Sequence, residues 1–126
     1  MKPIDGLTEQ VIGLAMKVHR TLGPGFLESV YQRALLLELK RAGLAAESEK
    51  QLRVIYEGEC VGDISADILV EDRLIIELKA VLEIAVAHEV QTVNYLVATG
   101  LDDALLINFG AASLQFKLKR RLPKSR

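Results

Sequence analysis

The sequence has a single cysteine and no long apolar run, and both features narrow the class of protein. Cys60 cannot form an internal disulfide framework, so the chain fits a reducing compartment such as the cytoplasm, although an odd cysteine can also pair between chains. No apolar stretch reaches the roughly 18 residues of a membrane span. The opening MKPIDG contains no apolar signal core. We therefore expect neither membrane insertion nor export.

The sequence also lacks the strong positive charge that would by itself indicate nucleic acid. Its 16 Lys and Arg and 17 Asp and Glu give a formal net charge of −1, whereas phosphate-binding proteins are often basic. Six basic residues and no acid do occur in KLKRRLPKSR, residues 117–126. This basic tail either contacts a polyanion such as nucleic acid or only makes the C-terminus more soluble. Composition and length are those of one globular domain over residues 1–126.

Hydrophobic periodicity predicts an N-terminal helical hairpin. An apolar stripe indicates a helix over residues 8–22, with Thr8 as its cap, and Gly23-Pro24-Gly25 ends it. A second helix is expected over residues 27–42. Its inward-facing residues are Leu27, Val30, Tyr31, Ala34, Leu35 and Leu39.

The period then changes from helix to strand. Alternation predicts strands near residues 52–56 and 61–70, after a polar stretch at 47–50. A strand that is apolar on both faces, and therefore expected to be covered on both, begins at residue 74. A helix is then expected over residues 83–99, where valines recur at helical spacing. Two further strands are expected, at residues 104–109 and, as an edge, near 114–119. This order predicts an α/β fold with a mixed central β-sheet flanked by helices.

Residues 74–82, LIIELKAVL, place two charges in a strand that should be covered on both faces. Unpaired buried ions cost several kcal/mol, so Glu77 and Lys79 need partners or serve chemistry. They share a face because side chains alternate along a strand. A three-residue loop would place Asp67 opposite Glu77, with Cβ atoms about 4.5–5.5 Å apart. A two-residue loop would set charges against apolar neighbours, so the odd loop is favoured.

Two facing carboxylates repel each other, and a divalent cation would remove that cost. Asp67 and Glu77, with the carbonyl of Leu78, form an oxygen donor set suited to Mg²⁺ or Mn²⁺. Lys79 beside them would position water or offset negative charge on a phosphate. The lack of a Cys/His cluster argues against structural zinc. A cross-strand salt bridge of Lys79 with the two acids is the structural alternative.

Several motifs in order resemble the PD-(D/E)xK nuclease superfamily. Asp67, nine residues, and then Glu77-Leu78-Lys79 resemble its core. More narrowly, GPGFLESVY contains Gly25, Glu28 and Tyr31 in the pattern that names the GxxExxY protein family. The likeness continues through DILVEDRLIIELKA, HEVQTVNYL and LLINFG. One departure is Ala66, where the superfamily name has proline. The resemblance implies a restriction-endonuclease-like core.

The resemblance also implies metal-dependent hydrolysis of DNA or RNA, with Mg²⁺ or Mn²⁺ as the cofactor. Asp67 and Glu77 resemble the metal-binding carboxylates, and Lys79 resembles the catalytic lysine. Glu28 is similar to the acid that the first core helix often adds to the metal site. Gln91 and Tyr95 are similar to a QxxxY element that helps place the nucleic acid and the active-site strand.

Other residues are weaker candidates for substrate contact. His88 lies on the face of Gln91 and Tyr95, by its i, i+3, i+7 spacing, and a phosphate contact competes with a surface or core role. For Tyr31 and Tyr95 the alternative is core packing. The remaining candidates are the outward lysines of the expected edge strand, Lys117 and Lys119.

Two other functional classes stay open at this point. One is a non-catalytic module that binds nucleic acid or protein on a nuclease-like fold, and the other is a purely structural charge cluster. A chain this short has little room for a substrate-binding domain, so we also expect that it could act as a homodimer or beside a partner protein.

Overall fold

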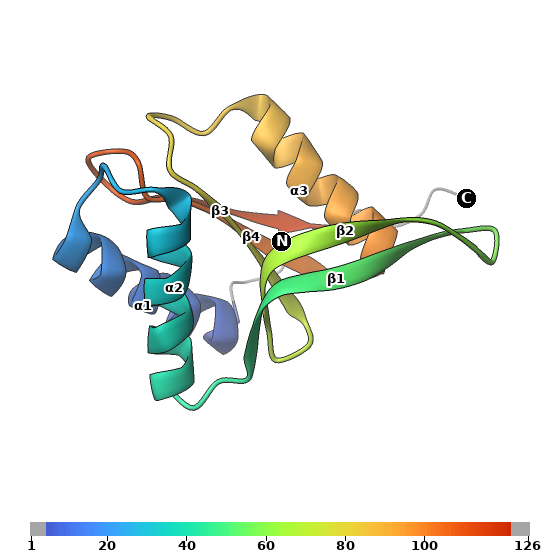
Figure 1. The fold of residues 1–126 in the computed structure, drawn as a ribbon, viewed down its shortest axis with the longest axis horizontal. Helices are drawn as coiled ribbons and strands as arrows, with labels where there is room; N and C mark the ends of the chain where they lie inside the picture. The colour runs from blue at the N-terminus through green and yellow to red at the C-terminus, as the bar shows by residue number, and fades with distance from the viewer. Residues whose placement is uncertain (1–4, 122–126) are drawn as a thin grey trace.

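The computed structural model of the chain describes residues 5–121. Within these residues, five strands form a mixed sheet and three helices flank it, which confirms the predicted α/β class (Figure 1). The elements are α1 (Gly6–Leu22), α2 (Glu28–Arg41), β1 (Ala46–Tyr56), β2 (Glu59–Val70), β3 (Leu74–Lys79), α3 (Val86–Thr99), β4 (Asp103–Asn108) and β5 (Gln115–Arg120). Within the described residues, no helix is both long and apolar enough to cross a membrane.

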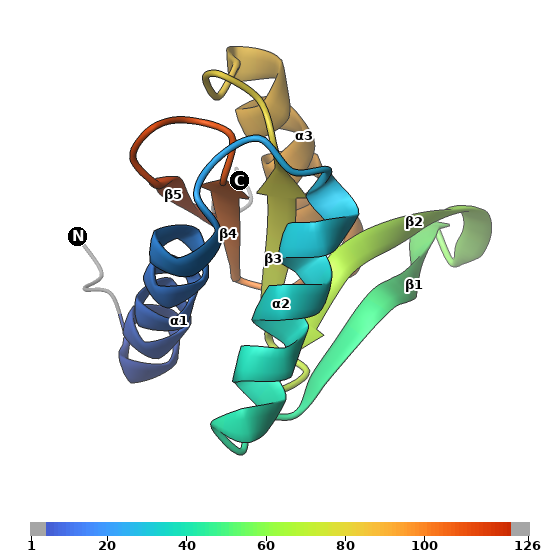
Figure 2. The ribbon, with the colours of Figure 1, turned by 60° about the vertical axis from the view of Figure 1, so that its left-hand side comes forward.

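The sheet has the order β1-β2-β3-β4-β5, so β3 is central and β5 is an edge. Neighbouring strands are antiparallel except β3 and β4, which are parallel because α3 crosses over between them. The hairpin α1–α2 covers one face, and α3 covers the other (Figure 2). Strand β3 is buried up to Leu78, as expected for a strand covered on both faces.

The helical hairpin differs from the prediction in two details. The N-cap of α1 is Asp5, whose carboxylate accepts a 2.9 Å hydrogen bond from the Thr8 N–H, so Thr8 is not the cap. In α2, Tyr31, Leu35 and Leu39 are buried, as their spacing predicted. Leu27 is 77% exposed because it is the N-cap and lies outside the helix, and Val30 is also exposed.

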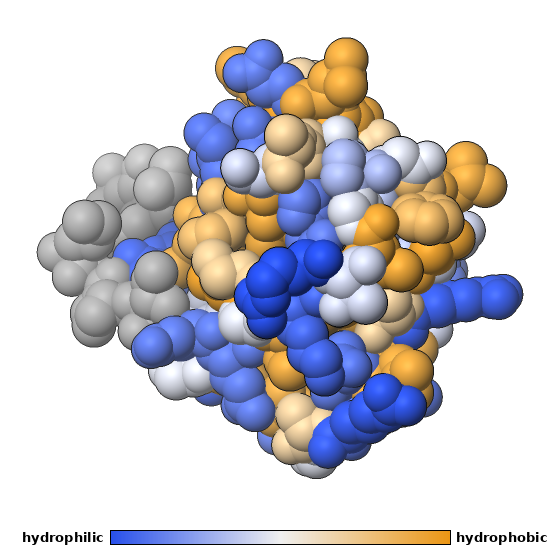
Figure 3. Space-filling model, turned by 90° about the vertical axis from the view of Figure 1, so that its left-hand side faces the viewer, coloured by the Kyte–Doolittle hydropathy of each residue, from blue (hydrophilic) through white to orange (hydrophobic). Residues whose placement is uncertain are grey.

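Apolar side chains remain on the outer surface of both helical layers. In α3, Thr92 and Leu96 are buried, whereas the stripe of Val86, Val90 and Val97 is exposed. Figure 3 shows that hydrophilic and apolar residues also alternate over the end of the molecule formed by the hairpin α1–α2. The valine spacing therefore predicted the helix correctly without marking its buried face.

The register of β2 and β3 is the predicted one. Val70 pairs with Leu74 and Ile68 with Ile76, which leaves a three-residue turn between the strands. Strand β1 begins at Ala46, earlier than expected, and includes the polar stretch at residues 47–50. Within it, Glu49 has a left-handed backbone with φ of 52°. The sheet is therefore distorted beside the position of Asp67.

Candidate active site

Asp67 and Glu77 lie one step beyond the last paired residues of β2 and β3, so they face each other across the two strands. The Asp67 N–H donates to Glu77 Oε1 at 3.3 Å, and the Leu78 N–H donates to Asp67 Oδ2 at 2.7 Å. Each carboxylate is thus held by the backbone of the opposite strand. At this point, hydrogen bonds from backbone to side chain follow the backbone pairing of β2 with β3.

Burial and mutual repulsion perturb this pair. Glu77 is 5% exposed, and its burial, followed by the negative charge of Asp67, raises its pKa to about 8. The pKa of Asp67 is also raised, chiefly by burial, although the hydrogen bond from Leu78 opposes this. At neutral pH Glu77 therefore carries a proton when no cation is present.

Lys79 follows on the same strand, and its positive charge lowers the pKa of both acids. Among the described residues, Lys79 makes no ion pair within the 4.0 Å limit. The cross-strand salt bridge that was the structural alternative is therefore not formed between these residues. The ammonium group acts on the acids through space.

Asn108 secures the chain just beyond Lys79, with which it pairs in the parallel ladder. It is fully buried, and its Oδ1 accepts hydrogen bonds from the N–H groups of Val81 at 2.9 Å and Gly110 at 3.0 Å. Its Nδ2 donates to Gln115 Oε1 at 2.9 Å. Sequence reasoning gave Asn108 no role, although it lies in the LLINFG motif.

Glu28 is the first residue of α2, and it lies within the electrostatic field of the strand acids. Glu28 is exposed as a whole, yet neighbouring atoms partly desolvate its carboxyl group. This desolvation raises the pKa of Glu28, and the negative charge of Asp67 raises it further. Lys79 acts in the opposite sense. The structure therefore brings Glu28 toward Asp67, Glu77 and Lys79.

Helix α3 places Tyr95 near the same acids. Burial, followed by the charges of Glu77 and Asp67, raises the pKa of the Tyr95 hydroxyl. Gln91, one turn earlier, is exposed. Both residues line a hollow of about 530 Å³ between α3 and the hairpin of β1 and β2, where Tyr56 is also exposed.

Tyr31 has the contacts of a packing residue. It is fully buried and stacks on Phe109, with ring centroids 4.7 Å apart. Its hydroxyl donates to the Gly23 carbonyl at 2.6 Å and accepts from the Phe26 N–H at 3.1 Å. Tyr31 therefore fastens the elbow immediately before Glu28.

The remaining predicted substrate contacts are engaged within the chain. Nδ1 of His88 accepts from the Ala85 N–H at 3.0 Å at the start of α3, which leaves the proton of the neutral ring on Nε2. Lys119 and Lys117 form ion pairs with Glu89, at 2.5 and 3.7 Å. Residues 122–126 of the basic tail lie outside the described residues.

Sequence reasoning missed one acid at the site, Glu49 on β1. Its neighbours pair as Ser48 with Ile68 and Lys50 with Ala66, which places Glu49 across from Asp67. Its negative charge contributes to the raised pKa of Asp67 and of Glu28. The strand alternation, continued back through the polar stretch, could have indicated an acid at this position.

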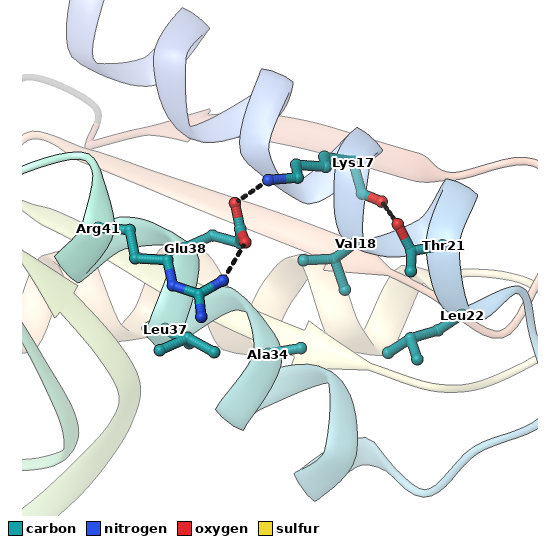
Figure 4. Close-up of a pocket in the computed structure, with 8 residues that line it drawn as sticks. All are labelled: Lys17, Val18, Thr21, Leu22, Ala34, Leu37, Glu38 and Arg41. Carbon is teal, nitrogen blue, oxygen red and sulfur yellow. Dashed lines mark hydrogen bonds and ion pairs between the residues drawn. The ribbon is translucent and has the colours of Figure 1, made fainter.

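An apolar hollow lies apart from these acids. It lies between α1 and α2, has a volume of about 310 Å³ and is walled by Val18, Leu22, Ala34 and Leu37 (Figure 4). Glu38 closes one side by pairing with Lys17 at 2.8 Å and with Arg41 at 3.5 Å. The residues that line this hollow include none of the predicted site residues.

The donor set at the strand acids suits a hard divalent cation. Carboxylate oxygens are the ligands that such ions prefer, and Asp67 and Glu77 each retain a second oxygen beyond the one bound to backbone. Across residues 5–121, no three Asp, Glu, His or Cys side chains are arranged to hold a metal ion. In this arrangement Glu28 therefore does not complete a three-ligand group with the two strand acids.

A mixed sheet that brings two acids and a lysine together on its central strands is consistent with a restriction-endonuclease-like nuclease fold. The sequence profile of the PD-(D/E)XK nuclease superfamily matches residues 5–121, so the chain belongs to this superfamily. Its nucleases generally use divalent metals and act on nucleic acid. No curated protein and no solved structure matches the chain.

Proposed function

We propose that the chain is a divalent-metal-dependent nuclease that hydrolyses phosphodiester bonds in DNA or RNA, and that it belongs to the GxxExxY family within the superfamily. The observation that carries this proposal is the pair of facing carboxylates, Asp67 and Glu77, in the electrostatic range of Lys79. Superfamily membership supports nuclease-like chemistry.

In the proposed mechanism, Asp67, Glu77 and the Leu78 carbonyl would hold Mg²⁺ or Mn²⁺, and Glu28 would move in from its metal-free position to join them. A bound ion of this kind polarises a phosphoryl oxygen and makes a water molecule more acidic. The backbone hydrogen bonds to Asp67 and Glu77 keep both carboxylates fixed, so little reorganisation is needed during the reaction. Lys79 orients the attacking water and offsets the charge that develops on the phosphate.

The nucleic acid is proposed to lie along α3. Gln91 and Tyr95 face the hollow between this helix and the hairpin of β1 and β2, and Tyr95 is also close enough to feel the charge of the acids. The His88 Nε2–H is the donor that this side chain offers a phosphate, because Nδ1 already accepts from backbone. Lys117 and Lys119 add positive charge at the other side of α3.

The proposal is tested by incubating the full chain with linear DNA, circular DNA and RNA, in Mg²⁺, Mn²⁺ or a chelator. Lys79→Ala is the test variant, and Lys40→Ala, on the exposed surface of α2, is the matched control. Cleavage that requires metal and survives in the control but not in Lys79→Ala supports the nuclease. Salt-sensitive binding of nucleic acid without cleavage would instead favour the non-catalytic module. If the chain neither cleaves nor binds nucleic acid, the structural charge cluster is the remaining interpretation.

Whether the chain acts as one domain alone, as a homodimer or beside a protein partner stays a prediction. Light scattering of the purified chain, with and without nucleic acid, measures its mass in solution and decides between one copy and two.

A further inference from the structure

A hydrogen-bond network outside the predicted site residues joins three elements beside the acids. The Gln32 Nε2 of α2 donates to Glu49 Oε1 on β1 at 2.9 Å and to the carbonyl oxygen of Asp67 on β2 at 2.9 Å. Ser65 Oγ donates to Glu49 Oε2 at 3.1 Å. We call the two central side chains, Gln32 and Glu49, the bracket.

The bracket contacts α2 close to Glu28, the first residue of that helix. Gln32 is one helical turn after Glu28, and residues four apart share a helix face. Both protons of the Gln32 amide are used, one on β1 and one on the backbone of Asp67 itself. The bracket therefore fixes the start of α2 against the strand that carries Asp67.

Glu49 is held in a conformation that its own preferences oppose. A left-handed backbone is unfavourable for a non-glycine residue and persists only where the surroundings impose it. Both carboxylate oxygens of Glu49 accept hydrogen bonds from neutral side chains, Gln32 and Ser65. Each oxygen of Glu49 thus already accepts one hydrogen bond within the chain, as expected for a positioning group.

We propose that Gln32 and Glu49 are positioning residues that set the placement of Glu28 and Asp67 for cation binding, without contacting the cation themselves. The expected effect on cation affinity rests on the proposed metal-dependent nuclease function. Its geometric part, the fixing of Asp67, applies to the metal-free chain as well.

The variants separate hydrogen bonding from charge. Gln32→Met and Glu49→Met keep approximate shape and remove the hydrogen bonds, whereas Glu49→Gln keeps the acceptor for Gln32 and removes the charge. Gln51→Met, at an exposed position of β1, is the matched control. Asp67→Asn shows the effect of losing a proposed ligand.

Two readouts are taken on the full chain without nucleic acid. Calorimetric titration with Mn²⁺ gives cation affinity, and hydrogen exchange of the Leu78 amide, which donates to Asp67 Oδ2, reports how firmly that carboxylate is held. We expect both Met variants of the bracket to weaken Mn²⁺ binding by about tenfold, the scale of groups that orient metal ligands. Leu78 exchange should quicken about tenfold, while amides of the β2–β3 ladder keep their rates.

Glu49→Gln should stay within about threefold of the wild type in Mn²⁺ affinity, because its amide oxygen still accepts from Gln32 and its amide N–H can donate to Ser65 Oγ. A loss as large as that of Asp67→Asn would make Glu49 a ligand and overturn the proposal. Faster Leu78 exchange with unchanged Mn²⁺ affinity would reduce the bracket to packing and also overturn it. A wild type that binds no Mn²⁺ would refute the metal-dependent function, and Leu78 exchange alone would then decide whether the bracket holds Asp67.

Discussion

Replacement of Glu77 by glutamine should stabilise the metal-free chain, and more so as the pH rises. Glutamine has the shape of protonated glutamate, so it keeps an acceptor for the Asp67 N–H and can donate toward the Asp67 carboxylate. It cannot ionise. Glu77→Gln therefore removes the charge that burial and Asp67 oppose while leaving the packing of β2 and β3 in place.

The sign and size of this stabilisation follow from the pKa of Glu77, which is about 8 in the folded chain and ordinarily 4.5. Below the lower value both states are protonated, and the group has no effect on the pH dependence of stability. Between the two values the unfolded chain ionises first, so the folded state loses stability as pH rises, until the loss levels off above the higher value. At about 1.4 kcal/mol per unit, the difference of 3.5 (8 − 4.5) gives about 5 kcal/mol in full, of which about 3 kcal/mol is reached by pH 7.

Urea unfolding at several pH values, in chelator, measures this directly. The free energy of unfolding of Glu77→Gln relative to the wild type should rise by several kcal/mol between about pH 4 and pH 9. The control is Glu59→Gln at the exposed start of β2, which makes the same substitution outside the buried pair. A constant difference between Glu77→Gln and the wild type would refute the buried, proton-holding Glu77 on which the reasoning depends.

Three other outcomes are expected. Mn²⁺ affinity should increase with pH, by up to about tenfold per unit until near pH 8, because the proton on Glu77 competes with the cation, and calorimetry at several pH values checks this. Tyr31→Phe should lower the free energy of unfolding by about 1–3 kcal/mol, measured in urea, because two backbone groups of the elbow lose their partner. Gly110→Ala should destabilise the chain in thermal unfolding, since its Cβ would collide with the backbone of Val81, whereas Gly13→Ala in α1 has open space and should stabilise it slightly.

The register that unites the two strand acids could be predicted from sequence because two local rules agree there. The hydrophobic pattern of β2 and β3 favours an odd loop, and a three-residue turn supplies it. The burial of β3 followed in the same way from its unbroken apolar run. Both rules concern residues close together in the chain, so no knowledge of the remaining packing was required.

Features that depend on packing between distant elements escaped prediction. Strand β1 extends through polar residues because β2 offers it a partner, and its left-handed Glu49 has no local signal. The ion pairs of Lys117 and Lys119 with Glu89 require α3 to lie against β5. The exposed valine stripe of α3 is a third case, because helical spacing shows that a face exists without showing what covers it.

Several unfavourable features of the fold lie around Asp67, and they bear on the choice between a structural and a functional charge cluster. A structural cluster would neutralise its charges, yet Glu77 is buried without a lysine partner, and Lys79 makes no ion pair with another described residue within 4.0 Å. Glu49, also strained, adds further negative charge beside Asp67. Chains retain such conflicts mainly at functional sites, where surrounding contacts hold them in place. A cation at Asp67 and Glu77 would remove both the repulsion between the two carboxylates and the need for a proton on Glu77, which Lys79, acting only through space, does not do.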